Sequence, residues 1–160
     1  MTIKAQFSKL TIIAAMLLGV LTMPVSAVAE DDHDHGQEVT KLTLNNGEKW
    51  EIDAPLSLAM SKIRNAMSEQ LDGIHANNLP QEKYNALANE VNTQIAYMIE
   101  NCELEPAADA QLHIIIHDLM NGAETMQSEA SAQAGAVKVV GAIENYTRYF
   151  NDPKLKPLKH

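Results

Sequence analysis

The sequence predicts an all-α protein, an up-down-up-down four-helix bundle preceded by a short N-terminal β-hairpin. Four stretches repeat apolar residues every three or four positions, which is the period of an amphipathic helix. The connections between these stretches are short, and short connections place consecutive helices antiparallel. Apolar residues make up 46% of the 160, and eight Met with scarce aromatic residues suit helix packing better than a β-sandwich.

The first segment, residues 1–29, has the features of a secretory signal peptide. Two lysines give a basic start, an apolar stretch follows, and small residues offer cleavage after Ala27 or Ala29. The apolar stretch ends at Pro24 and is shorter than the roughly 20 residues of a membrane span, which disfavours an uncleaved anchor. The sequence therefore predicts an exported protein, periplasmic or secreted, with no membrane span after cleavage.

Residues 30–40 form an acidic, polar segment that we expect to be disordered. His33 and His35 stand among aspartates there and could hold a divalent metal loosely. The alternative is a solvated acidic tail with no ligand.

The charge of the chain narrows the class of partner. The formal net charge is −9, and loss of Lys4 and Lys9 with the leader lowers the basic residues from 12 to 10 against 21 acidic ones. Such a surface repels phosphate groups and anionic lipid, which makes nucleic acid and membrane surfaces poor partners. A metal ion or a basic envelope protein suits it better.

Residues 41–52 are the only strand-like part of the sequence. Leucines alternate with polar residues before Asn46-Gly47, and Trp50 and Ile52 alternate after it. An Asn-Gly pair favours the two-residue turn of a β-hairpin, because both positions tolerate a positive φ. An isolated hairpin is marginally stable, so we expect Trp50 to pack against the bundle as a lid.

The helical bundle is expected over residues 53–151, with Asp53 as the first N-cap and Pro55 in the first turn. One apolar stripe predicts a first helix that ends near residue 76: Leu56, Met60, Ile63, Met67, Leu71 and Ile74. The second stripe comprises Tyr84, Leu87, Val91, Ile95, Met98 and Cys102. The third comprises Leu112, Ile115 or Ile116, Leu119, Ala123 and Met126, and the fourth Ala132, Ala136, Val139, Ile143, Tyr146 and Phe150. Residues 152–160 form a basic tail for which we expect no structure.

The residues most able to carry chemistry flank the turn between the second and third helices. Antiparallel register across this turn places Met60 and Met98 level with His113, and Cys102 about 9 Å away along the axis at 1.5 Å per residue. His117 shares a helix face with His113 and would be an outer ligand. Thioether, thiol and imidazole together make a soft ligand set, which selects Cu(I), with zinc as the second choice.

Core packing is the alternative for the same residues. Met60 and Met98 lie on apolar stripes, where methionine more often fills space than binds metal. Cys102 is the only cysteine, so in an oxidising compartment it is buried, bound to metal or bridged to another molecule.

The sequence motifs of haem proteins, di-iron bundles, phosphate-binding loops and serine hydrolases do not support those functions here. The sequence has no CxxCH, and the predicted fourth helix has no His or Met, so no haem is expected. The predicted helices lack the paired Glu and ExxH motifs of di-iron bundles, and the sequence has no Gly-rich phosphate loop and no GxSxG. The sequence does not predict an enzyme.

Three stretches together carry a family resemblance: LTLNNGEKWEIDAPL, NCELEPAADAQLH and GAVKVVGAIENYTRYFNDP. They resemble a family of small exported bacterial helical proteins, some of them labelled DnrO-like. The resemblance implies an exported compartment and a helical fold, but no mechanism. The leading hypothesis is therefore an exported bundle that binds a soft metal such as copper for sequestration or handover. The alternative is a metal-free structural or protein-interaction module.

Overall fold

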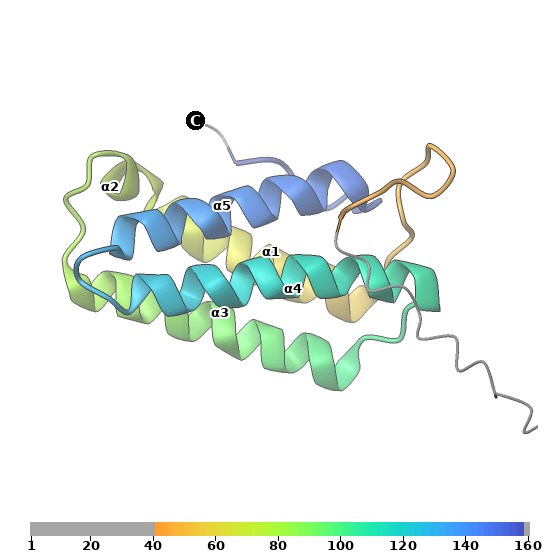
Figure 1. Ribbon diagram of the computed structural model, residues 1–160, viewed down its shortest axis with the longest axis horizontal. Helices are drawn as coiled ribbons and strands as arrows, with labels where there is room; N and C mark the ends of the chain where they lie inside the picture. Colours follow the sequence, from red (N-terminus) through yellow and green to blue (C-terminus); the bar gives the residue numbers. More distant parts are fainter. Residues whose placement is uncertain (1–40, 159–160) are drawn as a thin grey trace, which may run out of the picture. The chain divides into compact units, whose positions relative to one another are not determined.

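The computed structural model describes residues 41–158, and these form an all-helical bundle, as predicted (Figure 1). Predictions for the leader and the acidic tail lie outside the described residues. The helices are α1 (Ala54–Glu69), α2 (Leu71–His75), α3 (Gln81–Asn101), α4 (Pro106–Met126) and α5 (Ala132–Tyr149). None of these helices is both long enough and apolar enough to cross a membrane.

The long helices α1, α3, α4 and α5 pack around one core. α4 packs against α3 and α5, and α1 also packs between α3 and α5, so α1 and α4 lie diagonally opposite (Figure 1). Hydrogen bonds fix which helix ends meet. At one end, the side chain of Asp53 accepts a hydrogen bond from the backbone of Glu103, which joins the start of α1 to the α3–α4 turn. At the other end, Gln81 donates to the carbonyl of Met126. Consecutive long helices therefore run antiparallel.

The first predicted helix is wrong in one respect, because the chain breaks at Gln70 instead of continuing to residue 76. Gln70 leaves the helical conformation with φ −110° and ψ 4°, and the five-residue α2 follows. Leu71 and Ile74 still enter the core from α2. The apolar pattern thus identified the buried residues but could not register a change of helix direction between them.

Local sequence explains where the helices begin. The carboxylate of Asp53 accepts a hydrogen bond from the backbone of Leu56 at 2.9 Å and caps α1, as predicted. Proline starts α4 at Pro106, where the missing N–H would have no helical partner. Asn77 takes a positive φ of 49° directly after α2, a conformation that asparagine tolerates better than most residues.

The predicted β-hairpin is reduced to its turn, and residues 41–158 contain no strand. Asn46 and Gly47 have φ values of 50° and 93°, as a type I′ turn requires, and Asn45 pairs with Glu48 on either side. Beyond this pair the chain turns to the bundle instead. Trp50 packs on the core, as predicted, and exchanges backbone hydrogen bonds with residues 149 and 151 at 2.8 Å.

The core is built from the four predicted stripes. Every stripe residue is buried except Cys102, which is half-buried. Residues 152–158 have no helix or strand, but the expectation of a tail without structure is wrong for them. Leu155 and Leu158 are buried, and Arg64 of α1 donates to the carbonyls of Lys156 and Pro157. We call residues 154–158 the C-terminal strap.

Candidate functional site

The predicted soft-metal layer is divided between the core and the surface. Met60 and Met98 are 0% and 1% exposed, whereas the side chains of His113 and His117 are 70% and 74% exposed. The structure therefore does not bring the imidazole of His113 together with the two buried thioethers. His113 follows Leu112 by about 100° around the helix, and that rotation carries the imidazole out of the core.

Cys102 stands at the end of α3, where the chain leaves the helix in an extended conformation. Burial, then the charge and hydrogen bonding of Asp53, then the charge of Asp109, raise the pKa of the Cys102 thiol to about 12. The neutral thiol therefore dominates at neutral pH, whereas the nucleophile and the metal ligand is the thiolate. A metal would have to displace this proton in an environment that opposes a second negative charge.

Near the thiol, a carboxylate ties together the end of α5 and the start of α1. Asp152 accepts hydrogen bonds from the Tyr146 hydroxyl at 3.0 Å and from the Ser57 hydroxyl at 3.2 Å. Burial and the Asp152 charge raise the pKa of Tyr146 above its ordinary value. The partners of Asp152 are all hydrogen-bond donors, as its carboxylate requires, and the arrangement holds elements together without presenting a reactive group.

The exposed side of α4 carries the other part of the predicted ligand set. His113 Nδ1 lies 2.9 Å from the carbonyl oxygen of Asp109 and 3.4 Å from its carboxylate. Because a carbonyl oxygen can only accept, Nδ1 carries the proton, and in the neutral ring Nε2 is left as an unprotonated lone pair. Metal-binding histidines commonly have this arrangement, with the second nitrogen donating to a carbonyl or carboxylate.

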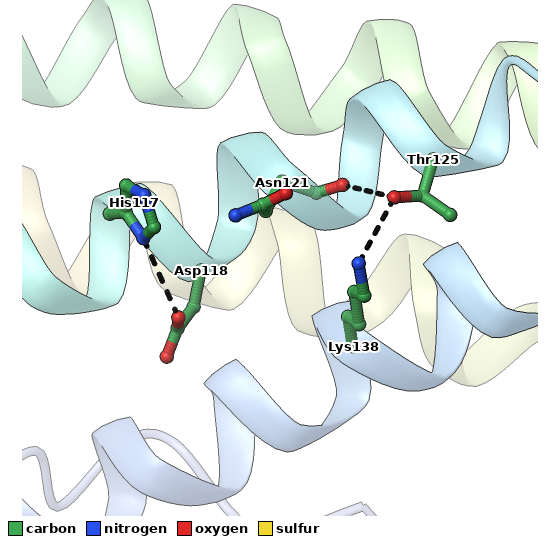
Figure 2. A network of polar contacts seen from close by, with 5 residues as sticks. All are labelled: His117, Asp118, Asn121, Thr125 and Lys138. Carbon is green, nitrogen blue, oxygen red and sulfur yellow. Dashed lines mark hydrogen bonds and ion pairs between the residues drawn. The ribbon is translucent and has the colours of Figure 1, made fainter.

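His117 lies one turn further along the same helix, with its Nδ1 3.8 Å from the carboxylate of Asp118 (Figure 2). This distance is an ion-pair contact, longer than a hydrogen bond. Further along α4, Thr125 accepts a hydrogen bond from Lys138 of α5 at 3.3 Å (Figure 2). We call the exposed stripe of Asp109, His113, His117, Met120 and Glu124 the imidazole face.

Electrostatics set the α3–α4 region apart from the rest of the bundle. No Lys or Arg occurs between Lys83 and Lys138. The charged residues in that span are all acidic: Glu90, Glu100, Glu103, Glu105, Asp109, Asp118, Glu124 and Glu129. The imidazole face therefore stands in a field that attracts cations.

The described residues set a limit on any metal site. Within residues 41–158, no three His, Cys, Asp or Glu side chains are grouped so that they could hold one ion. His113 and His117 remain as a pair whose side chains lie on one face, with Cβ atoms about 5–6 Å apart at this spacing. Sequence reasoning missed Asp53 and Asp109, the partners of the thiol and the imidazole. The i, i+4 spacing of Asp109 and His113 was the available signal for the second.

A surface groove lies beside the imidazole face, between α4 and α5. It holds about 300 Å³ and is lined by Asp118, Asn121, Lys138 and Asn145 with two small residues. A second groove of about 410 Å³ lies between α1 and α3 and presents two lysines and two glutamates. Neither groove has a net charge or a buried reactive group that selects a ligand.

The fold and the site define a helical bundle with a paired-imidazole surface. No family model, curated protein or solved structure matches the chain. The resemblance to small exported helical proteins therefore stays a prediction, and a functional proposal rests on the residues alone.

Proposed function

We propose that the protein is exported and captures a transition-metal dication, copper(II) ahead of zinc(II), through His113 and His117. The observation that carries the proposal is a pair of exposed imidazoles one helical turn apart, on a helix that has no Lys or Arg. Two histidines at this spacing share one helix face and can chelate a single metal. Capture of this kind serves sequestration or handover of the metal.

The ligand chemistry favours a dication over Cu(I). Cu(I) is selected by thiolate and thioether ligands, but Met60 and Met98 are enclosed in the core and the Cys102 thiol is held protonated. Imidazole suits copper, zinc and nickel as dications, and copper(II) binds a given nitrogen site more tightly than zinc(II). The exposed ligands thus change the preferred ion from the one that the sequence suggested.

Two further features support capture at this face. The hydrogen bond from His113 Nδ1 to Asp109 orients the ring and leaves Nε2 directed away from its own helix turn. The surrounding carboxylates raise the local concentration of cations and speed their arrival. Ring orientation and the attraction by carboxylates both favour binding of a dication, and neither requires a change in the fold.

The test is a titration of the mature chain with Cu²⁺ against a competing chelator at about pH 7.5. His33 and His35 are replaced by Ala throughout, so that the acidic tail cannot contribute. We expect one site, and we expect His113→Ala or His117→Ala to weaken it by at least about tenfold, because even loss of an outer-shell partner typically costs 10–100-fold. Lowering the pH to about 5 should also weaken it, since protons compete for imidazole nitrogen.

His75→Ala is the matched control, because His75 is an imidazole on α2, at the opposite end of the bundle from the α3–α4 turn. It should leave the affinity unchanged. Cys102→Ser tests the thiol in the same way and should also have little effect. Equal affinity of the wild-type chain and the His113→Ala, His117→Ala double variant would refute the proposal.

A metal-free interaction module is the second candidate, and the same surface favours it. The α3–α4 region is acidic, and it exposes two large apolar side chains, Ile99 at 69% and Met120 at 52%. A basic envelope protein is the partner that such a surface would accept. This candidate requires that Cu²⁺ leave the melting temperature unchanged, whereas metal at a hundredfold above Kd would stabilise the native state by about 2.7 kcal/mol.

A further inference from the structure

We infer that the metal joins two copies of this chain, with each copy supplying the His113 and His117 pair from its imidazole face. The inference rests on the proposed function and extends it to the stoichiometry of the site and to the partner. The partner is a second copy of the chain, held by a shared ion.

Within residues 41–158, one chain does not supply enough ligands for a closed site. Zinc(II) in a closed site takes four protein ligands in a tetrahedron. Residues 41–158 hold no group of three candidate ligands, and the His113–His117 pair supplies only two. Two copies related by a twofold axis would supply four imidazoles, because an interface of this symmetry uses the same patch on both chains.

The imidazole face is also accessible to another helix. α4 lies at the outer edge of the bundle, diagonally opposite α1, and both rings are more than two-thirds exposed. Met120 follows His117 by three residues, is 52% exposed, and gives the face an apolar side chain that a second copy would cover. A second α4 can therefore reach the rings without unfolding any element.

The negative charge of the imidazole face makes the pairing depend on metal. Asp109 and Asp118 lie beside the rings, and Glu124 lies further along the same helix, so two bare imidazole faces would repel one another. A dication between them offsets part of this charge and supplies directional bonds to both. Without metal the chains separate, and with metal they pair.

Sedimentation velocity of the mature chain, carrying His33→Ala and His35→Ala, tests the inference. The probe is Zn²⁺ alone, added at half an equivalent and followed by EDTA. We expect monomer without metal, dimer with one Zn²⁺ for two chains, and return to monomer with EDTA. His113→Ala and His117→Ala should each abolish the dimer.

Two matched variants separate pairing from binding. Met120→Glu adds a negative charge to the imidazole face but keeps both ligands, so we expect Zn²⁺ to bind while the dimer weakens by at least about tenfold. Ile99→Glu makes the same change on α3, which supplies no residue of this face, and should leave the dimer intact.

The outcomes also separate this inference from the proposed function. A monomeric complex with one Zn²⁺ for each wild-type chain overturns the pairing and leaves metal capture standing. A dimer that forms equally well without metal, or in the double histidine variant, overturns the pairing as well. Absence of any Zn²⁺ or Cu²⁺ binding overturns both.

Discussion

At the scale of single residues, the surroundings of Cys102 decide what its thiol can do. Asp53 has two oxygens already engaged, one by the backbone of Leu56 and one by that of Glu103 at 2.7 Å. Its negative charge is therefore fixed beside the sulfur by structural hydrogen bonds. Ionising the thiol would place a second negative charge next to it, which explains the direction of the pKa shift.

The reactivity of Cys102 should follow this shift. A thiol whose pKa is about 12 in place of the ordinary 9.0 has on the order of a thousandfold less thiolate at pH 8. We expect iodoacetamide to alkylate native Cys102 far more slowly than the urea-unfolded chain. The rate should keep rising with pH beyond 10, where an ordinary thiol has reached its plateau. Mass spectrometry of quenched samples measures it.

Asp53→Asn is the control for the electrostatic cause. Asparagine caps a helix about as well as aspartate, so α1 should be retained while the charge is lost. We expect faster alkylation in this variant and a pH profile moved to lower pH. An unchanged profile would assign the protection to burial and Asp109, with no part for Asp53.

The placement of the candidate ligands could be predicted from the sequence only in part. The stripe identified Met60 and Met98 as core residues, and the i, i+4 spacing paired His113 with His117. The apolar stripe of α4 also implied that the pair lies beside the buried face, because each histidine directly follows a core residue, Leu112 or Ile116. The stripe could not give the exposure of the rings, which depends on how α3 and α5 flank that helix.

At the scale of elements, the tightest packing joins α4 to α5. A methyl group added at Gly135 would lie 2.6 Å from the carbonyl oxygen of Gly122 and even closer to the backbone of Met126. A methyl group at Gly122 would meet Val139 at 2.6 Å. These two glycines let the helices approach because neither carries a Cβ.

Gly135→Ala should therefore destabilise the bundle, although alanine is the better helix former. Backbone atoms cannot move aside as a flexible side chain can, and overpacking of this kind typically costs about 1–3 kcal/mol. The free energy of unfolding, measured by urea denaturation, should fall by that amount.

Gly141→Ala is the matched control on the same helix. Nothing lies within 4 Å of a methyl group added there. Alanine should then stabilise α5 by about 0.5–1 kcal/mol, because glycine loses more backbone freedom on folding. Opposite signs at the two positions would confirm the close approach, and gains at both would contradict it.

Elements with strong local signals were predictable, and those that depend on distant contacts were not. Asp53 and the Asn46-Gly47 turn each act through their own backbone, and each appears where the sequence placed it. The strands of the hairpin failed because Trp50 pairs with the end of α5 instead. A local pattern of apolar and polar residues cannot indicate a backbone hydrogen-bond partner that lies about one hundred residues away in the sequence.

At the scale of the whole molecule, the ends of the described chain close the bundle. The segment before α1 is tied to α5 through Trp50 and to α4 through Thr43, whose N–H donates to the buried side chain of Gln111 at 2.7 Å. The C-terminal strap returns along α1 after α5 has ended. Both segments lack regular structure, yet both cover core residues.

The strap was missed because its composition is that of a loose basic tail. Leu155 and Leu158 are separated by Lys156 and Pro157, which gives no helical or strand period. Hydrogen bonds hold this backbone against α1 instead, because the carbonyls of Lys156 and Pro157 accept from Arg64 at 3.1 and 3.5 Å. The two leucines are buried as a result.

Leu158→Ala should destabilise the whole bundle, which would show that the strap belongs to the folded unit. Leu158 is 5% exposed, and truncation of a buried leucine to alanine costs about 2–5 kcal/mol, with the lower end expected at the edge of a core. Arg64→Ala should cost about 1 kcal/mol through the lost hydrogen bonds. Lys156→Ala is the control, since only its carbonyl binds Arg64, and its free energy of unfolding should stay within about 0.5 kcal/mol of wild type.

Urea denaturation followed by helical circular dichroism measures the stability of all three variants. The strap has no helix, so a lower urea midpoint for Leu158→Ala in the helical signal reports loss of stability in the helices that the strap covers. An unchanged midpoint would mean that the strap detaches without destabilising the bundle.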